Sequence, residues 1–325
     1  MKRLVFTGVE QFHFDEVADL KIEGEKEVLI DITHAGICGT DLHIYSGRRK
    51  VNYPLVAGHE AIGIVKAIGS KVTKVKVGDR VAMEPNTMCR TCALCMSGHN
   101  NLCHSKILKG LNVDGVFQTQ TKANEEYFWV LPDNITPQEG IVIETATVAL
   151  AAVNKAGIRL GDYVFITGAG TVGLLVTQLA KLSGAIVTVM DLNPKRLELA
   201  QKLGADYICG SDILLPKDVN IAIDCAGVAP TINTCISVVK NAGTFISVGI
   251  AGKPIEIDMM NITRRELNVK GSVACTTEFP TVIQLISEGK LDASTMVSAT
   301  VPFENLVDGI KMMESQEAIK VAVSL

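Results

Sequence analysis

The sequence GDYVFITGAGTVGLLVTQLAKLSGAIVTVMD spans Gly161–Asp191 and predicts a strand, a glycine-rich turn, a helix and a second strand. Tyr163–Thr167 is a short run of β-branched and aromatic residues, which is typical of a strand. Val172–Leu182 then has apolar residues at helical spacing until Gly184 ends the pattern, and Ile186–Met190 is again strand-like. This order predicts a βαβ unit with a Gly-x-Gly-x-x-Gly turn at the start of its helix.

The glycines of that turn predict a dinucleotide site. They allow a sharp turn, let a pyrophosphate approach the backbone and let the helix pack closely on the sheet, while the amide groups at the helix start bind the anion. Asp191 ends the second strand, where a carboxylate binds ribose hydroxyls and repels a 2′-phosphate, so the sequence favours NAD over NADP. Arg196 would instead suit NADP, and a glycine-rich turn of an ordinary α/β protein is the other alternative. The residues expected to contact the cofactor are Gly168, Gly170, Thr171, Val172, Gly173, Asp191 and Arg196.

The composition is that of a soluble globular protein with no electrostatic basis for binding nucleic acids or anionic membranes. The 325 residues carry a formal net charge of −4, without a block of like charges. No apolar run approaches the ~18 residues of a membrane span, and the N-terminus lacks the continuous apolar core of a signal peptide. We therefore expect a cytoplasmic protein that binds neither nucleic acid nor membranes.

Four of the nine cysteines lie close together in the pattern Cys-x2-Cys-x2-Cys-x7-Cys. An odd cysteine count without an export signal favours metal thiolates in a reducing compartment over disulfides. Four thiolates fill the tetrahedral shell of zinc and leave no position for a substrate, which predicts a structural zinc site. An iron-sulfur cluster is the alternative, although the bacterial ferredoxin pattern spaces its fourth cysteine differently and follows it with proline. The four residues are Cys89, Cys92, Cys95 and Cys103.

The pattern of predicted elements changes along the chain and indicates an α/β protein of two domains. Residues 1–146 contain short strand-like runs such as Val28–Thr33 and Ala61–Ile68, interrupted by Gly, Pro and Asn, and predict a mostly β domain. Residues 147–273 alternate strands with helices, and six strands is the number of a doubly wound parallel sheet. Residues 274–325 are too few for a domain, so we expect them to pack back on the first one and complete it.

A second group of potential metal ligands lies upstream of the cysteine cluster. Cys38 opens the motif Cys-Gly-Thr-Asp-Leu-His, and Gly58-His59-Glu60 follows about twenty residues later. A thiolate, an imidazole and a carboxylate leave a fourth position on zinc for water or substrate, which is the pattern of a catalytic zinc. A single Cys or His is more often a packed residue than a ligand, so the hypothesis depends on the joint placement of all three.

Taken together, these motifs resemble the zinc-containing alcohol and polyol dehydrogenases of the medium-chain dehydrogenase/reductase superfamily. The two ligand motifs, the four-cysteine loop and the glycine-rich turn occur in that family's order and approximate spacing over nearly the whole chain. Glu84-Pro85 and Ile143-Glu144-Thr145 are most similar to the sorbitol and polyol dehydrogenase branch. The resemblance implies a GroES-like catalytic domain, a Rossmann domain inserted before its C-terminal piece, one catalytic and one structural zinc, NAD, and a homodimer or homotetramer.

The resemblance also implies the ligands of the catalytic zinc. Cys38, His59 and Glu60 would bind the metal, and Glu144 would be a further carboxylate that binds it directly or through water. Zinc can lower the pKa of bound water from about 15.7 to about 7, and it should acidify a substrate alcohol in the same way. The expected reaction is hydride transfer between NAD and a secondary alcohol.

Three residues of the first motif match positions that relay protons or orient ligands in that family. We expect the substrate proton to pass through the Thr40 hydroxyl and the cofactor ribose toward His43. Asp41 would orient His59, as carboxylates commonly orient ligating imidazoles. The alternative is that Thr40 and Asp41 only cap the helix that begins here.

Two departures from the polyol dehydrogenase pattern leave the substrate open. Ile44 stands where those enzymes have a Tyr after the His, and Ala274 aligns where some have a substrate-binding Arg. Threonine dehydrogenases share the first motif, but their His before the cysteine loop is replaced here by Pro85-Asn86-Thr87. We expect a polyol or sugar alcohol as substrate, with a sugar-alcohol phosphate or an amino alcohol as alternatives. A non-catalytic member of the superfamily is the alternative of another class.

Two further segments carry hypotheses about partners. Arg48-Arg49-Lys50 could bind the phosphate of a sugar-alcohol phosphate, because Arg and Lys suit its geometry and charge, or could be a solvated loop. Thr244–Gly249 resembles the edge strand through which Rossmann domains of the family pair, which is the basis for expecting a homo-oligomer.

Overall fold

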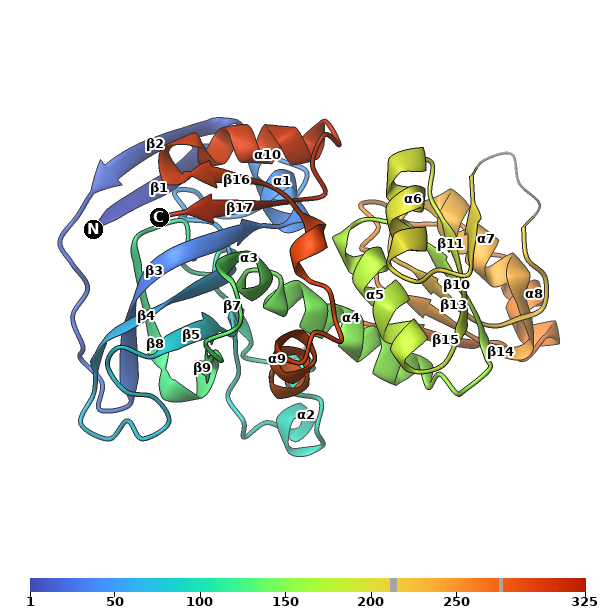
Figure 1. The fold of residues 1–325 in the computed structure, drawn as a ribbon, viewed down its shortest axis with the longest axis horizontal. Coiled ribbons are helices and arrows are strands. Elements are labelled where there is room, and N and C mark those ends of the chain that lie inside the picture. The colour runs from blue at the N-terminus through green and yellow to red at the C-terminus, as the bar shows by residue number, and fades with distance from the viewer. Residues whose placement is uncertain (211–214, 275–276) are drawn as a thin grey trace. The chain divides into compact units, whose positions relative to one another are not determined.

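The computed structural model describes residues 1–210, 215–274 and 277–325, which form two units (Figure 1). Unit 1 comprises Met1–Glu144, Phe279–Ser287 and Ala293–Leu325, and unit 2 comprises Thr145–Glu278 and Glu288–Asp292. Within the described ranges, no helix combines the length and the apolar character that crossing a membrane requires.

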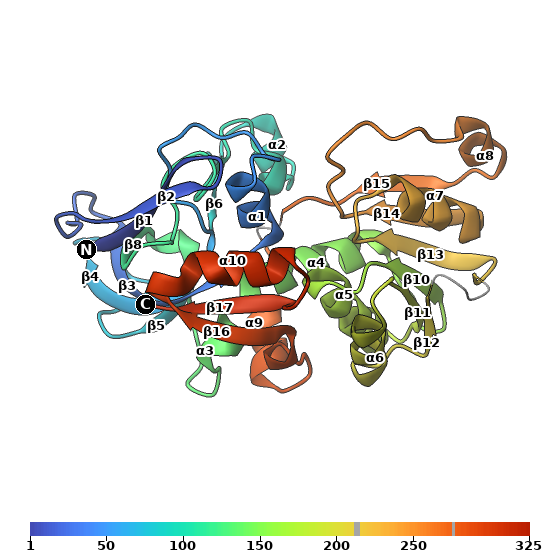
Figure 2. The same cartoon turned by 90° about the horizontal axis from the view of Figure 1, so that it is seen from above.

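Unit 2 is a six-stranded parallel sheet with helices on both faces. Its strand order is β12-β11-β10-β13-β14-β15, the 3-2-1-4-5-6 order of a doubly wound dinucleotide-binding fold. Helices α5 and α6 lie on one face and α7 on the other (Figure 2). The strands are β10 Tyr163–Thr167, β11 Ile186–Met190, β12 Tyr207–Cys209, β13 Val219–Asp224, β14 Val239–Ser247 and β15 Asn268–Gly271. The helices are α4 Ile143–Ala156, which begins at the end of unit 1, α5 Thr171–Leu182, α6 Pro194–Lys202, α7 Ala229–Val238 and α8 Met259–Arg264.

Local sequence explains why these elements form where they do. Helix α6 begins at Pro194, because the Asn193 side chain accepts a hydrogen bond of 3.0 Å from the Lys195 N–H and proline suits the first helical position. Buried Phe165 and Phe245 pack with aliphatic residues in a hydrophobic cluster of this unit. The predicted doubly wound sheet is therefore confirmed.

The edge of this sheet differs from the expectation. Strand β14 lies between β13 and β15, so the prediction that Thr244–Gly249 is an edge strand is wrong. Asn268–Gly271 pairs in register with Thr244–Ser247 and forms the edge, with all four of its residues exposed. The sixth strand of a doubly wound sheet pairs outside the fifth on this side, so the sixth strand, which the sequence also predicts, forms the edge.

Unit 1 is built on a seven-stranded sheet whose central strand is β3. The order is β16-β17-β3-β4-β5-β9, β8 also pairs with β3, and only β16 and β17 run parallel to each other. A hairpin of β1 and β2 and a short pair of β6 and β7 lie outside this sheet. The strands are β1 Lys2–Gly8, β2 Gln11–Glu16, β3 Glu27–Ile37, β4 Glu60–Ile68, β5 Arg80–Met83, β6 Asn86–Thr87, β7 Ile107–Leu108, β8 Gln120–Asn124, β9 Phe128–Val130, β16 Val297–Pro302 and β17 Lys320–Ser324. The helices are α1 Gly39–Tyr45, α2 Ala93–Met96, α3 Pro137–Gly140, α9 Phe279–Ser287 and α10 Leu306–Glu314.

Three strand ends meet at one edge of the unit 1 sheet. Gly36, near the carboxyl end of β3, pairs with Glu60 of β4 on one side and with Ala322 of β17 on the other. Because both pairings are antiparallel, the carboxyl end of β3 lies beside the amino ends of β4 and β17. This arrangement brings the residues at positions 38, 60 and 320 together, although they are far apart in the sequence.

Candidate metal centres and nucleotide site

Cys38, His59 and Glu60 converge at this meeting of strand ends. The sulfur, a ring nitrogen and a carboxylate oxygen all lie within 4.8 Å of one another. His59 and Glu60 are buried, at 5% and 0% relative exposure, whereas Cys38 is partly exposed. Soft sulfur, imidazole nitrogen and a carboxylate around one point form a donor set that suits zinc, and the partly exposed cysteine leaves access from outside.

The charges around His59 favour a cation at this point. Burial by itself would lower the pKa of His59, but the Cys38 sulfur, Asp41 and Glu144 raise it well above its usual range. Glu144, the second residue of α4, has its pKa raised to about 7 by burial and by Glu60, although His59 opposes this shift. Several groups that are anionic when deprotonated therefore surround one imidazole, and a divalent cation would replace the protons that they hold.

Asp41 has two structural functions in addition to any effect on His59. Its Oδ2 accepts a hydrogen bond of 2.9 Å from the Cys38 N–H at the start of α1, and its Oδ1 accepts one of 3.1 Å from the Gly58 N–H. The distance from Oδ1 to His59 Nδ1 is 3.9 Å, too long for a hydrogen bond. The fully buried carboxylate thus ties the two ligand segments together and caps the helix.

Thr40 and His43 lie on one face of helix α1, because they are three residues apart. His43 is exposed at the surface of unit 1. Partial burial of its ring, together with the charges of Arg48 and Arg49, lowers the pKa of His43. The imidazole is therefore neutral near pH 7 and able to accept a proton.

The sequence did not point to Lys320, which also belongs to this centre. It starts strand β17, is only 1% exposed, and donates to Glu60 Oε2. The signal that could have found it is an isolated lysine in an otherwise apolar strand-like segment.

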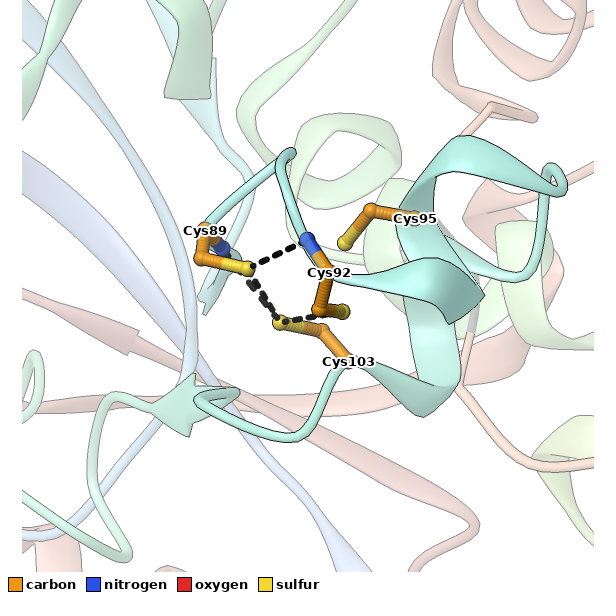
Figure 3. A group of neighbouring side chains, drawn as sticks. All are labelled: Cys89, Cys92, Cys95 and Cys103. Carbon is orange, nitrogen blue, oxygen red and sulfur yellow. Dashed lines mark hydrogen bonds between the residues drawn. The ribbon is translucent and has the colours of Figure 1, made fainter.

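The four cysteines of the other cluster lie in the segment between β6 and β7 of unit 1 and point toward a common centre (Figure 3). The Cys89 and Cys103 sulfurs are 3.5 Å apart, and those of Cys92 and Cys103 are 3.9 Å apart. Zinc with Zn–S bonds of about 2.3 Å separates its tetrahedral sulfurs by roughly 3.8 Å, so the observed spacing fits the ion. N–H groups that point at Cys89 lower the pKa of its thiol to about 6, which favours the thiolate form that binds metal.

The glycine-rich turn of unit 2 has the geometry of a nucleotide site. Gly168 has a φ of 88°, which favours glycine, and a Cβ on Gly173 would overlap the Gly168 carbonyl oxygen. A Cβ on Gly170, the residue that caps α5, would meet nothing within 4 Å. The first glycine therefore allows the sharp turn, the second leaves an open approach to the helix start, and the third lets the helix pack closely. A pyrophosphate site requires all three features. Thr171 and Val172 begin α5 at this approach.

Asp191 and Arg196 lie beside the turn. Asp191 Oδ2 accepts a hydrogen bond of 2.7 Å from the Ala169 N–H, and Oδ1 accepts one of 2.8 Å from the Asn193 N–H. A carboxylate has about four acceptor positions, so the same group can still accept ribose hydroxyls. Arg196 Nε is buried and has no hydrogen-bond partner in the described part of the chain. Both residues thus retain capacity for a ligand.

Asp224 supports the turn from the end of strand β13, and the sequence did not point to it. Its carboxylate is fully buried and accepts hydrogen bonds from the Thr167 and Thr231 hydroxyls, at 2.8 and 2.6 Å, and from the Gly227 N–H, at 2.8 Å. This network fixes the loop after β13, whose Ala226 lies against Gly168. A lone carboxylate that ends an apolar strand is the signal that could have found it.

The basic segment after α1 is partly occupied by protein contacts. Arg48 donates to Glu314 over 2.7 Å and to the Ser46 hydroxyl over 2.8 Å. The guanidinium is therefore already paired, which favours the interpretation of this segment as a surface loop.

Comparison with known proteins agrees with both units. Residues 24–133 match the alcohol dehydrogenase GroES-like domain, and residues 171–288 match the family described as zinc-binding dehydrogenase. D-xylulose reductase A of Aspergillus niger is 32% identical over 98% of this chain and 95% of its own length. Galactitol-1-phosphate dehydrogenase from Escherichia coli covers 100% of both chains with a TM-score of 0.93 and 27% identity. A protein of Sinorhizobium meliloti 1021, described as a zinc-binding dehydrogenase and solved with NADP, covers 100% of this chain and 99% of its own, with a TM-score of 0.93 and 29% identity. The predicted GroES-like and Rossmann folds are confirmed.

Proposed function

Because the chain belongs to the zinc-binding medium-chain alcohol dehydrogenases, we propose that it is a zinc-dependent enzyme that transfers hydride between NAD and a polyol or sugar alcohol. The observation that carries this proposal is the convergence of Cys38, His59 and Glu60 at one point of unit 1. A dehydrogenase that had lost its activity would have no reason to keep this buried ligand cluster, which is costly to assemble without a cation.

In this proposal, Cys38, His59 and Glu60 hold the catalytic zinc, and Glu144 stands beside it as a further carboxylate. When bound, zinc supplies a Lewis acid that makes a substrate hydroxyl more acidic, and the nicotinamide accepts the hydride. The cysteine cluster holds a second, structural zinc, and the sulfur spacing there supports a single ion.

The protein's own residues move the proton. The Thr40 hydroxyl can accept a proton and donate its own, and neutral His43 on the same helix face can take the proton toward solvent. Asp41 keeps the Cys38 and His59 segments in place through its two backbone hydrogen bonds. A Thr40→Ala variant with normal metal content and greatly reduced turnover would support this relay.

NAD is the proposed cofactor because the negative charge of Asp191 would repel the 2′-phosphate of NADP. Gly168, Gly170, Thr171, Val172 and Gly173 form the site for the pyrophosphate, and Arg196 is the residue that would admit NADP. The related Sinorhizobium meliloti structure contains NADP, so the test must compare both cofactors. Steady-state kinetics with each cofactor should give the higher kcat/KM for NAD, and a preference for NADP would contradict the assignment.

The substrate class follows from the relatives. D-xylulose reductase supports a polyol and its ketose as the substrate pair, whereas galactitol-1-phosphate dehydrogenase supports the phosphorylated alternative. We propose the unphosphorylated polyol, because Arg48 is already paired with Glu314. Turnover of D-xylulose with NADH, compared with galactitol 1-phosphate and NAD, tests this choice. No turnover of any polyol, in protein with only one zinc per chain, would favour the non-catalytic alternative.

The proposed assembly is a homo-oligomer that pairs through β15, whose exposed residues form the sheet edge. None of the eight cysteines in the described residues forms a disulfide, in keeping with the cytoplasmic location that we propose. Light scattering at several protein concentrations would establish the assembly.

A further inference from the structure

A buried ion pair joins the ligand cluster of unit 1 to the C-terminal strand. The Lys320 ammonium donates to Glu60 Oε2, and the two side chains are 1% and 0% exposed. Glu60 begins β4 and Lys320 begins β17, and these strands lie on opposite sides of β3. The pair therefore spans three strands.

The carboxylate crosses β3 at Gly36. This glycine pairs with Glu60 on one side and with Ala322 on the other. A Cβ built on Gly36 would overlap Glu60 Oε2, and the Glu60 Cβ and Cδ atoms would lie only 3.2 Å from it. The missing side chain at Gly36 thus provides the space through which Glu60 reaches Lys320.

An ion pair at this depth needs a reason beyond stability. Moving an ammonium and a carboxylate out of water is so unfavourable that apolar side chains of similar size commonly stabilise a fold at least as well. The ammonium contacts Glu60, whose carboxylate lies within 4.8 Å of the Cys38 sulfur and of a His59 ring nitrogen, so its positive charge lies beside the point where a metal ion would be held.

We propose that Lys320 is a positioning residue of the metal centre, which holds one oxygen of Glu60 and thereby limits this carboxylate to a single-oxygen contact with the metal. It also reduces the net negative charge of the ligand cluster. The inference rests on the proposed function in one respect, that the Cys38, His59 and Glu60 cluster binds a divalent metal. Without the ammonium, both oxygens of Glu60 would be available to the metal, and the ligand cluster would hold the metal more tightly.

The test uses full-length protein with cobalt(II) at the Cys38 centre and zinc at the cysteine cluster, because cobalt absorption reports the number of ligands. Lys320→Met removes the charge but keeps an unbranched side chain. Its visible absorption per cobalt should weaken as the coordination number rises. When the Lys320→Met variant competes with a chelator for the metal, its dissociation constant should be at least about tenfold lower than that of the wild type. The reason is that a positive charge beside the ion has been removed. Lys320→Arg, which keeps the charge, should return both measurements toward the wild-type values.

Two further variants make the result specific. In Gly36→Ala, a methyl group displaces Glu60 Oε2 while Lys320 remains. The cobalt spectrum should therefore change in the same direction as in Lys320→Met. This variant tests the inference even if Lys320→Met does not fold. Lys181→Met is the matched control, because Lys181 forms its ion pair with Asp206 in unit 2, at 2.7 Å. This control should leave the cobalt spectrum and the metal affinity unchanged.

The outcomes separate the inference from the proposed function. Unchanged spectra and affinity in folded Lys320→Met and in Gly36→Ala would show that the pair merely links β4 to β17, and the inference would be wrong. Wild-type protein that takes up metal only at the cysteine cluster would refute the proposed catalytic centre, and the inference with it.

Discussion

Replacing Asp41 with asparagine should destabilise unit 1 far more than the carboxylate-to-amide change at a comparable but only partly buried position. The fully buried Asp41 carboxylate accepts backbone hydrogen bonds from Cys38, at 2.9 Å, and from Gly58, at 3.1 Å. An amide has the same shape but only one acceptor oxygen, so one of these N–H groups would face an NH₂ group.

The magnitude follows from these two contacts. Losing a hydrogen bond to a charged group costs about 2 kcal/mol, and leaving a buried donor without an acceptor costs roughly 1 kcal/mol more. Burial raises the pKa of Asp41, although His59 opposes the shift, so removing the charge recovers part of this loss. We expect a net loss of about 2 kcal/mol from the free energy of unfolding of unit 1.

Glu139→Gln is the matched control. Glu139 occupies the equivalent position in helix α3, where its Oε2 accepts from the Thr136 N–H at 2.8 Å and from the Thr136 hydroxyl at 2.7 Å, but it is only partly buried. Glutamine also serves in this capping arrangement, so the loss should stay below about 0.5 kcal/mol.

The assay uses the chain's single tryptophan, which lies in β9 of unit 1. The Trp129 ring stacks on Phe279 with centroids 5.8 Å apart and donates to Glu84 Oε2 over 3.1 Å, so its fluorescence reports the unfolding of this unit. Both variants are unfolded with denaturant at a fixed free zinc concentration, because bound metal adds to apparent stability. Equal losses in the two variants would refute the role of the buried contacts.

Three further predictions concern metal and cofactor. Cys38→Ser should lower the zinc content from two ions per chain to one and abolish turnover. Cys95→Ser should also lose one zinc and should lose thermal stability, but it should keep turnover at low temperature. Elemental analysis and activity assays distinguish the two variants. Zinc uptake by metal-free protein at pH 6.5 should release protons, and the zinc affinity should rise with pH, because the pKa of His59 lies well above its usual range and that of Glu144 at about 7. Calorimetry in buffers of different ionisation enthalpy measures the protons, and Glu144→Gln should release about half a proton fewer at pH 7. Asp191→Ser should raise kcat/KM for NADP relative to NAD, and an unchanged ratio would exclude Asp191 as the discriminating residue.

Most of unit 2 could be predicted from the sequence because its central strands β10, β11 and β13 are mostly buried. Strands β10 and β11 have the predicted bounds, since parallel strands covered by helices appear as continuous apolar runs between turn residues. Unit 1 was less accessible to prediction. Strand β2 is mostly exposed and β16 alternates between half-buried and exposed residues, so neither has the apolar run that marks a strand.

The two groups of candidate metal ligands could be predicted because they occur in short motifs whose residue types and spacing match the coordination of zinc, and the structure brings the members of each group together. Asp41 shows the limit of this approach. Its position predicted both a helix cap and a carboxylate near His59, and the structure gives it the cap and a bridge to Gly58, with His59 Nδ1 3.9 Å away. Spacing in the sequence did not indicate which backbone group would face its second oxygen.

Lys320 could not be found by motif, because its function depends on strand order. Its neighbours in the sequence are apolar, and only the antiparallel pairing of β17 and β4 with β3 brings it to Glu60, 260 residues away. A physical argument still connects the two residues. Glu60 is also a charged residue at the start of a mostly apolar strand, and a buried charge of either sign needs a partner of the opposite sign. The opposite charges of Glu60 and Lys320 therefore predict that β4 and β17 lie close enough for the two side chains to pair. In the structure both strands flank β3, and Gly36 of β3 leaves the space in which the side chains meet.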